Sequence, residues 1–243
     1  MDPETGSIGG VTIRAVLFDF AGTLLVPVPA PQWVREVTDS LGLGLDDAAV
    51  ADLARRLVDA GRPGGPEPTG LPPDLDARHD RRDVSIAEHR SLYTALLGRV
   101  TGEGSVLTDA LYDASCRPEG WSAYPDSQPT LGVLRSAGVG LAVVSNVGFD
   151  LRAVFAGHGL EDLVDVWALS CELGAVKPAP ELFRVALDGL GVDAADALMV
   201  GDNPRADGAA TALGIRTLLL PYSVPHRPHG LAAVVDLVRG SGA

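Results

Sequence analysis

The chain has 243 residues, enough to bury one substantial core and to carry a second, smaller module. Hydrophobic residues make up 46% of the sequence and aromatic residues only 5%, so aliphatic side chains must fill the core. The formal net charge of −13 argues against nucleic acid or anionic lipid as a partner, because both are bound through clustered Lys and Arg. We therefore expect neither a nucleic-acid-binding nor a membrane-binding protein.

No run of about 18 apolar residues occurs, and residues 1–10 have neither a basic start nor an apolar core. We predict a soluble, cytoplasmic protein in which residues 1–10 form a Gly-rich flexible tail without a chemical role. The two cysteines, Cys116 and Cys171, lack the spacing of a metal site and are too few for a disulfide framework. The sequence does not indicate an oligomeric state.

The first predicted element, Val11–Phe18, is a short apolar and β-branched run typical of a buried parallel strand. It ends at Asp19, which places a carboxylate at the carboxyl end of the strand, where open α/β sheets bind their ligands. Helical periods then prevail between residues 27 and 118. The predicted helices there are Gln32–Leu41, Asp46–Ala60, Asp83–Val100 and Ser105–Cys116, with a Gly/Pro-rich connection at Gly61–Pro73.

Beyond Tyr124, strand and helix patterns alternate, as in an α/β fold. The predicted helices are Gln128–Ala137, Phe149–His158, Glu181–Leu190 and one that ends at Thr211–Leu213. The predicted strands are Val139–Val144, Val164–Leu169, Ala197–Val200 and Ile215–Leu220. The pattern indicates one doubly wound, Rossmann-like α/β domain with a parallel sheet, formed by residues 11–26 and 119–243 and interrupted by a helical insert at 27–118.

Polar side chains gather at or after the predicted strand ends. They are Asp19, Ser145, Lys177, Asp202 and Asp207. Strand ends of a parallel sheet converge on one edge, so these residues can share a site. A carboxylate nucleophile needs a cation beside it, a hydroxyl or amide to hold the transferred oxygens, and an ammonium to balance developing charge. Lys177 is the single lysine of the chain, which makes it a specific candidate for the ammonium.

Each of these signals alone also has a purely structural interpretation. An Asp or a Ser-Asn pair after a strand is often a turn former or a helix N-cap, and a single lysine is usually a solvated charge. Only the order, the spacing and the strand-end placement taken together favour a catalytic site.

Four segments, in this order, resemble the motifs of the haloacid dehalogenase (HAD) superfamily of hydrolases. They are Asp19-Phe20-Ala21-Gly22-Thr23-Leu24, Val143-Val144-Ser145-Asn146, Lys177-Pro178-Ala179-Pro180-Glu181-Leu182-Phe183, and Gly201-Asp202-Asn203 with Asp207 and Ala209. The resemblance covers the chain from about Val11 to Pro221. The helical insert resembles the cap of the first cap class, which implies a small-molecule substrate because such a cap closes over the site and excludes water.

The resemblance implies a role for each matching residue. Asp19 corresponds to the nucleophile that forms an aspartyl intermediate, Ser145 to the hydroxyl that holds a phosphoryl oxygen, and Lys177 to the lysine that steadies both groups. The implied cofactor is Mg²⁺, which suits ligation by oxygen alone. Its predicted ligands are Asp19, Asp202, Asp207 and the backbone carbonyl of Ala21. The predicted substrate-binding residues in these motifs are Gly22, Thr23 and Asn146. The implied substrate is a small phosphate ester.

Residue 21 departs from the pattern of the superfamily's phosphatases, most of which carry a second Asp there. That Asp protonates the leaving group and then activates water, whereas this chain has Ala21. Losing the group without a replacement is expected to cost about 10²–10⁴-fold in rate. The helical insert offers candidates for a replacement, which are His79, Asp80, Glu88 and His89. His89 and Arg90 are also predicted to bind the substrate. On this helix His89 and Tyr93 form an i, i+4 pair, whose face points either toward the site or into the insert's own packing.

Other interpretations accompany the phosphatase. A 2-haloacid dehalogenase needs no leaving-group acid, because halide leaves unprotonated, but that branch works without metal and Asp202 favours phosphoryl chemistry. A binding or regulatory protein would keep the fold without turnover, yet it would not need every motif residue. A phosphonoacetaldehyde hydrolase also carries Ala here but forms a Schiff base through a cap lysine, and the insert has no lysine. The sequence thus predicts a HAD-like hydrolase, and a Mg²⁺-dependent phosphatase best accounts for it.

Overall fold

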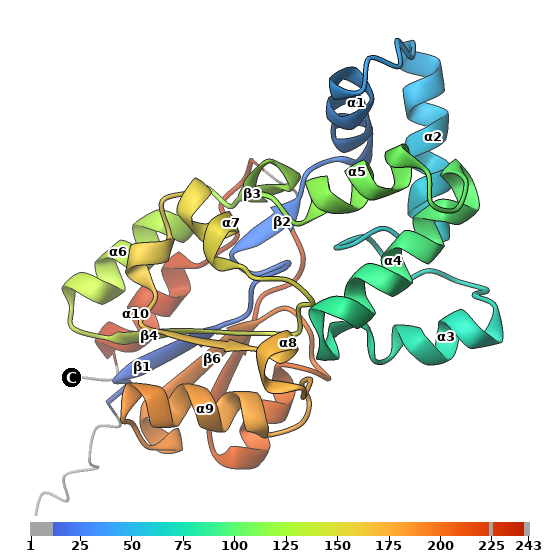
Figure 1. Cartoon of the computed structure of the whole chain (residues 1–243). Coiled ribbons are helices and arrows are strands. Elements are labelled where there is room, and N and C mark those ends of the chain that lie inside the picture. Colours follow the sequence, from blue (N-terminus) through green and yellow to red (C-terminus); the bar gives the residue numbers. More distant parts are fainter. Residues whose placement is uncertain (1–11, 224–225, 241–243) are drawn as a thin grey trace, which may run out of the picture.

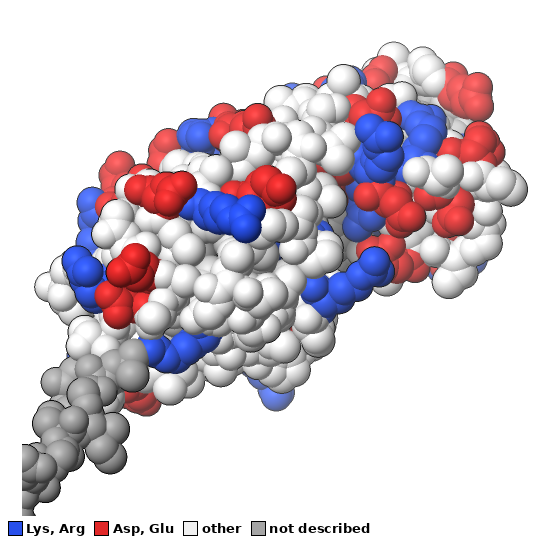
Figure 2. All heavy atoms as spheres, turned by 90° about the horizontal axis from the view of Figure 1, so that it is seen from below, with Lys and Arg blue, Asp and Glu red and all other residues white. Residues whose placement is uncertain are grey.

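The computed structural model describes residues 12–223 and 226–240, so the tail predicted for residues 1–10 lies outside the described residues. Figure 1 shows an α/β part built around one sheet, with a helical part to one side of it. None of the helices within the described ranges has the length and apolar character needed to cross a membrane. On the face seen in Figure 2, acidic and basic side chains are interspersed and do not gather into one basic patch.

The α/β part is centred on a five-stranded parallel sheet with the strand order β5-β4-β1-β6-β7. The strands are β1 (Ala15–Phe18), β4 (Gly140–Ser145), β5 (Val166–Leu169), β6 (Ala197–Gly201) and β7 (Arg216–Leu219). The chain builds the sheet outward from β1 through β4 to β5, and then crosses back to place β6 on the other side of β1. The predicted doubly wound fold is confirmed, and its switch point lies between β1 and β6.

Both faces of the sheet are covered by helices. One face carries α6 (Ser127–Ser136), α7 (Arg152–Gly157) and α10 (Ala232–Gly240), and the other α9 (Glu181–Leu190) and the 3₁₀ helix η5 (Gly208–Leu213). Successive residues of a strand point to opposite faces, so Phe18 packs into the first layer and Leu17 into the second. Burial on both faces explains why β1 is a continuous apolar run in the sequence.

The helical part has its own hydrophobic core. Its helices are α1 (Ala30–Ser40), α2 (Asp47–Ala60), α3 (Pro73–His79), α4 (Ile86–Thr101) and α5 (Val106–Ser115). Buried side chains from α1, α2, α4 and α5 form this core, among them Trp33, Leu57, Leu96 and Leu111. Three of the helices begin at a side-chain N-cap, because Asp46, Ser85 and Ser105 each accept a hydrogen bond from the backbone amide three residues later.

The two parts are joined through a short antiparallel ribbon. It consists of β2 (Leu25–Pro27) and β3 (Trp121–Ala123), with Leu25 opposite Ala123 and Pro27 opposite Trp121. The chain therefore leaves the α/β part and returns to it at neighbouring points, which Figure 1 shows between the sheet and α5.

Several elements differ from the sequence-based expectations. The helix predicted from Phe149 begins at Arg152, since the Asp150 side chain accepts a hydrogen bond from the Arg152 amide and forms a turn there. The helix predicted from Asp83 begins at Ile86, because Ser85 is the N-cap. Asp83 lies instead in a 3₁₀ turn, η1 (Arg82–Val84). The sequence analysis also missed β2, β3, α3, α8 (Ser170–Leu173) and α10.

Candidate active site

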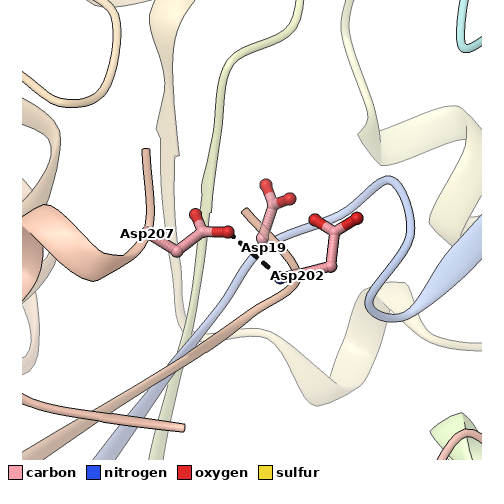
Figure 3. Close-up of side chains that lie close together, drawn as sticks. All are labelled: Asp19, Asp202 and Asp207. Carbon is pink, nitrogen blue, oxygen red and sulfur yellow. Dashed lines mark hydrogen bonds between the residues drawn. The ribbon is translucent and has the colours of Figure 1, made fainter. Parts of the chain in front are cut away.

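Three carboxylates meet at the switch point of the sheet (Figure 3). Asp19 directly follows β1, Asp202 directly follows β6, and Asp207 comes from the loop before η5. Each of them offers an oxygen, and these oxygens all lie within 4.8 Å of one another. The structure therefore brings together all three side chains that were predicted to bind a metal.

Lys177 forms the centre of the hydrogen-bond network around these carboxylates. Its Nζ lies 2.8 Å from Asp19 Oδ1, 2.6 Å from Asp207 Oδ1 and 2.8 Å from the backbone oxygen of Val144. Burial alone would lower the pKa of Lys177, but Asp19 and Asp207 raise that pKa above its ordinary value. The side chain is thus a charged ammonium with all three of its protons directed at acceptors.

Asn146 holds the backbone of Lys177 in place. Its Nδ2 donates to the Lys177 carbonyl at 3.0 Å, and its Oδ1 accepts from the Lys177 amide at 2.6 Å. This paired contact joins the end of β4 to the loop that carries the lysine. The amide predicted to bind substrate therefore positions Lys177, while the neighbouring Ser145 is buried and lines the same cavity as Asp19.

Two glycines create the space for this packing. Gly22 has a φ of 84°, and a Cβ on it would lie 2.3 Å from Asp202 Oδ2. A Cβ on Gly201 would lie 2.2 Å from Asp207 Oδ2. Any side chain at either position would displace a carboxylate. The adjacent Thr23 is fully buried, and its hydroxyl has no hydrogen-bond partner among the described residues.

The cluster carries more negative than positive charge. Asp207 Oδ2 accepts from the amides of Asp202 and Asn203 at 3.1 Å and 2.9 Å, yet burial and Asp19 still raise the pKa of Asp207. Burial, Asp19 and Asp207 raise the pKa of Asp202 to about 7. The three carboxylates outnumber the one ammonium. They form a ligand set made of oxygen alone, which fits a hard divalent cation such as Mg²⁺.

The carboxylates line a cavity of about 1190 Å³ that is shared with the helical part. The α/β part contributes Asp19, Ala21, Gly22, Ser145, Asn146, Lys177 and Asp202. The helical part contributes Arg62, Glu67, His79, Asp80, Arg82, Asp83 and His89. Residues from both parts can therefore contact one ligand.

His89 is a buried neutral side chain at the wall of this cavity. Its Nδ1 lies 2.9 Å from the Tyr112 hydroxyl, and burial together with Arg82 lowers the pKa of His89 to about 3. A Cβ on Gly148 would come within 2.1 Å of His89 Cβ, so α4 rests directly on the loop after β4. A histidine that stays neutral near pH 7 is poorly suited to protonate a leaving group.

The other candidates from the helical part vary in their placement. Arg90 does not line the cavity and pairs with Asp113 at 2.6 Å and Asp109 at 3.0 Å. Glu88 is exposed and does not line the cavity, while Asp80 is exposed at its edge. His79 is buried in the cavity wall, where its Nδ1 lies 3.1 Å from a guanidinium nitrogen of Arg82.

Asp83 lines the cavity but was not among the predicted site residues. Its Oδ2 lies 3.5 Å from Arg82 Nε and its Oδ1 3.9 Å from His89 Nε2, and its side chain is 13% exposed. The Ser170 hydroxyl donates to the Asp83 carbonyl at 2.6 Å, which fastens this turn to the α/β part. Burial raises the pKa of Asp83. The Ser85-x-x-Glu88 pattern, which marks a helix start at Ile86, was the available signal that Asp83 precedes the helix.

A parallel sheet that presents a buried Asp-Lys pair and further carboxylates at its strand ends, beneath a helical part, places the chain among the α/β enzymes that carry their site at the sheet edge. Residues 13–214 match the model of the haloacid dehalogenase-like hydrolases, and the chain belongs to this family.

Two phosphatases are among the proteins that the chain resembles. The chain is 30% identical over 237 residues to phosphoglycolate phosphatase of Rhodospirillum rubrum, covering 92% of this chain and 87% of that protein. It is 33% identical over 215 residues to ribulose-1,5-bisphosphate 5-phosphatase of Halopiger xanaduensis, covering 86% and 85%. The structure of L-2-haloacid dehalogenase from Xanthobacter autotrophicus shares the fold, with a TM-score of 0.61 at 21% identity over 95% of this chain and 84% of that one. The protein is thus a HAD-like hydrolase with phosphatase relatives.

Proposed function

We propose that this hydrolase is a Mg²⁺-dependent phosphatase of a small phosphate ester and that Asp19 is its nucleophile. The observation that carries the proposal is the position of Asp19, which is hydrogen-bonded to the Lys177 ammonium inside an all-oxygen carboxylate cluster. A haloacid dehalogenase that works without metal has no need of the ionisable carboxylate at Asp202. The two phosphatase relatives, each matched over most of its length, support the same choice.

In the first step, a carboxylate oxygen of Asp19 attacks phosphorus, and the bond from phosphorus to the ester oxygen breaks. Lys177 holds Asp19 Oδ1, which leaves Oδ2 to form the new bond. The Ser145 hydroxyl is expected to donate to a phosphoryl oxygen, and the ammonium balances the charge that builds up there. Water then cleaves the aspartyl-phosphate, releasing inorganic phosphate and restoring Asp19.

The predicted metal ligands are Asp19, Asp202, Asp207 and the backbone carbonyl of Ala21. When bound there, Mg²⁺ supplies positive charge opposite the phosphoryl oxygens. Without it, a dianionic phosphate would approach three carboxylates with only Lys177 in compensation. We expect activity to depend on a divalent cation for this reason.

Asp83 is the residue we assign to the acid/base role that Ala21 does not fill. A carboxyl group that protonates the leaving oxygen must carry a proton near neutral pH, and burial raises the pKa of Asp83 in that direction. The side chain lines the same cavity as Asp19, and the charge of Asp19 contributes to this shift. In this assignment the helical part acts as a cap that completes the site.

The test is release of inorganic phosphate from a panel of phosphate esters with Mg²⁺. Asp19→Asn is expected to reduce turnover by about 10⁴-fold or more, because it removes the carboxylate that attacks phosphorus. The matched control is Asp162→Asn at an exposed position outside the cavity, which should leave the rate unchanged. No release from any ester, or equal activity of Asp19→Asn, would exclude the proposal.

A dehalogenase remains the second candidate, and Ala21 is the observation that favours it. In that case halide would be released from a 2-haloacid and the reaction would persist in a strong chelator. A regulatory protein would bind Mg²⁺ and phosphonates without turnover of either substrate class. These three outcomes separate the three interpretations.

A further inference from the structure

Arg62 is a buried cation that the proposed phosphoryl chemistry does not use. It directly follows Gly61, the C-cap of α2, and the residue is only 4% exposed. One guanidinium nitrogen, Nη1, donates to the Val28 carbonyl at 3.1 Å, and the guanidinium carbon lies 4.4 Å from the centre of the Trp33 ring. The guanidinium is thus fixed on one edge and one face.

The other edge of this guanidinium makes no hydrogen bond with the described residues. Nε is buried without a hydrogen-bond partner, and within residues 12–223 and 226–240 no acceptor is recorded for Nη2. No carboxylate oxygen of the residues in these ranges lies within 4 Å of an Arg62 guanidinium nitrogen, although the chain has 32 acidic residues. Burial lowers the pKa of Arg62 to about 10, so the side chain stays charged near neutral pH. An unpaired buried charge is costly, which points to a missing anion.

Arg82, which lines the same cavity, shows how the charge of an arginine is usually balanced. Its guanidinium lies 3.0 Å from Glu67 and 3.5 Å from Asp83, so protein carboxylates already balance its charge. Arg62 lies in the wall of the cavity that also holds Asp19 and Lys177. The unbalanced charge therefore faces the space in which a substrate of Asp19 would bind.

We propose that Arg62 binds a second anionic group of the substrate, at the end away from the phosphoryl group that Asp19 attacks. The ligand class is a phosphate ester that also carries a carboxylate or a second phosphate. Nε is itself enclosed by the protein, so the donor available to such a group is Nη2, and an N–H···O⁻ hydrogen bond from a guanidinium to a carboxylate or phosphate is charge-assisted. The inference rests on the proposed phosphatase function and adds a requirement for the substrate.

Binding of phosphonates tests the proposal without turnover. In calorimetric titrations with Mg²⁺ present, the wild-type protein should bind phosphonoacetate and methylenebisphosphonate about 10- to 100-fold more tightly than methylphosphonate, which lacks the second anion. Arg62→Gln should remove this difference and leave the affinity for methylphosphonate within about twofold. The two probes that carry a second anionic group, phosphonoacetate and methylenebisphosphonate, also show whether a carboxylate or a phosphonate is preferred there.

Turnover provides the second measurement. Arg62→Gln should raise KM for a phosphorylated 2-hydroxy acid by about 10- to 100-fold and leave kcat/KM for p-nitrophenyl phosphate unchanged. Arg62→Lys keeps the charge but lacks the planar guanidinium, so its KM should fall between those of the two proteins. The matched control is Arg56→Gln, an exposed arginine on α2 that pairs with Asp52 and does not line the cavity.

The outcomes distinguish this inference from the function on which it rests. Wild-type affinity for methylphosphonate that equals the affinities for both phosphonoacetate and methylenebisphosphonate would overturn the role of Arg62, whatever the enzyme hydrolyses. An equal loss for every probe in Arg62→Gln would also overturn it, because Arg62 would then act only in packing against Trp33. Failure to hydrolyse any ester, with the selective phosphonate binding intact, would instead refute the phosphatase proposal alone.

Discussion

The two buried cations of the cavity, Lys177 and Arg62, are held in opposite ways. Lys177 on the α/β side directs its protons at two carboxylates and a carbonyl. Arg62 on the helical side has a carbonyl and an aromatic ring but no carboxylate. The charge of Lys177 is thus balanced by protein carboxylates, and that part of the site needs only the proposed metal ion. The charge of Arg62 has no carboxylate beside it, and in our proposal an anion of the substrate balances it. The difference teaches that Lys177 serves the reaction centre, whereas Arg62 serves the ligand.

The strongest way to break this comparison is to remove the better-held cation. Lys177→Met leaves Asp19 and Asp207 buried without their ammonium, so we expect a loss of about 3–5 kcal/mol in the free energy of unfolding. Phosphatase activity should fall by about 10³-fold or more, because the nucleophile loses its partner. Urea unfolding and steady-state kinetics measure the two effects. A stable variant with residual activity would show that the pair is dispensable.

The next largest effect is expected at Asp83, on the helical wall. Asp83→Asn removes the proposed proton donor and should lower kcat by about 10²–10⁴-fold for alkyl phosphates. The loss should be smaller for p-nitrophenyl phosphate, whose leaving group departs without a proton. Asp76→Asn, exposed on α3, serves as the control. Equal losses for both ester types would mean that Asp83 does not act as the acid.

Ala21→Asp sharpens the same assignment. Ala21 lines the cavity next to the nucleophile and is not fully buried, so an Asp side chain has a route into the site. In the Asp83→Asn background this change should restore about 10- to 100-fold of the lost turnover, because it returns an acid/base group to the neighbourhood of Asp19. In the wild-type background the gain should be small if Asp83 already fills the role. The absence of any rescue would favour a site built for leaving groups that need no proton.

The smallest predicted effect concerns Asp202 and pH. Its pKa rises from 3.8 to about 7, so the folded metal-free protein binds an extra proton between these values. The contribution of Asp202 to stability is therefore present at low pH and declines as pH rises from about 4 to about 7. Relative to Asp202→Asn, the wild-type protein should lose on the order of 1–2 kcal/mol over this range, after allowance for solvent screening. Urea unfolding in a chelator measures this loss of stability, and added Mg²⁺ at pH 8 should restore the stability that is lost.

The sheet edge was predictable from sequence for a simple physical reason. A parallel strand buried on both faces is an apolar run, and its end is marked by the first polar residue, as at Asp19 and Asp202. Because all strand ends of such a sheet share one edge, Lys177 and Asp19 could be placed together although 158 positions separate them.

No comparable rule applies to the helical part. Whether a residue such as Arg62 or Asp83 faces the cavity depends on how α2, α4 and the connection between them pack. Arg62 also lies in a Gly/Pro-rich stretch, which indicates only a connection between helices. Periodicity placed His89 and Tyr93 on one helix face, but whether His89 or Arg90 meets the cavity or a protein neighbour depends on how the helices pack. His89 lines the cavity, while Arg90 pairs with Asp109 and Asp113.

The ribbon of β2 and β3 has an evolutionary consequence. Since Pro27 lies opposite Trp121, the segment 28–120 begins and ends at adjacent points, and its own core is separate from those on the sheet. A segment of this kind can be lengthened, shortened or replaced while the strand ends that carry Asp19 and Lys177 keep their positions. New ligand preferences can thus arise by changes in the segment 28–120 while the reaction centre on the sheet stays the same.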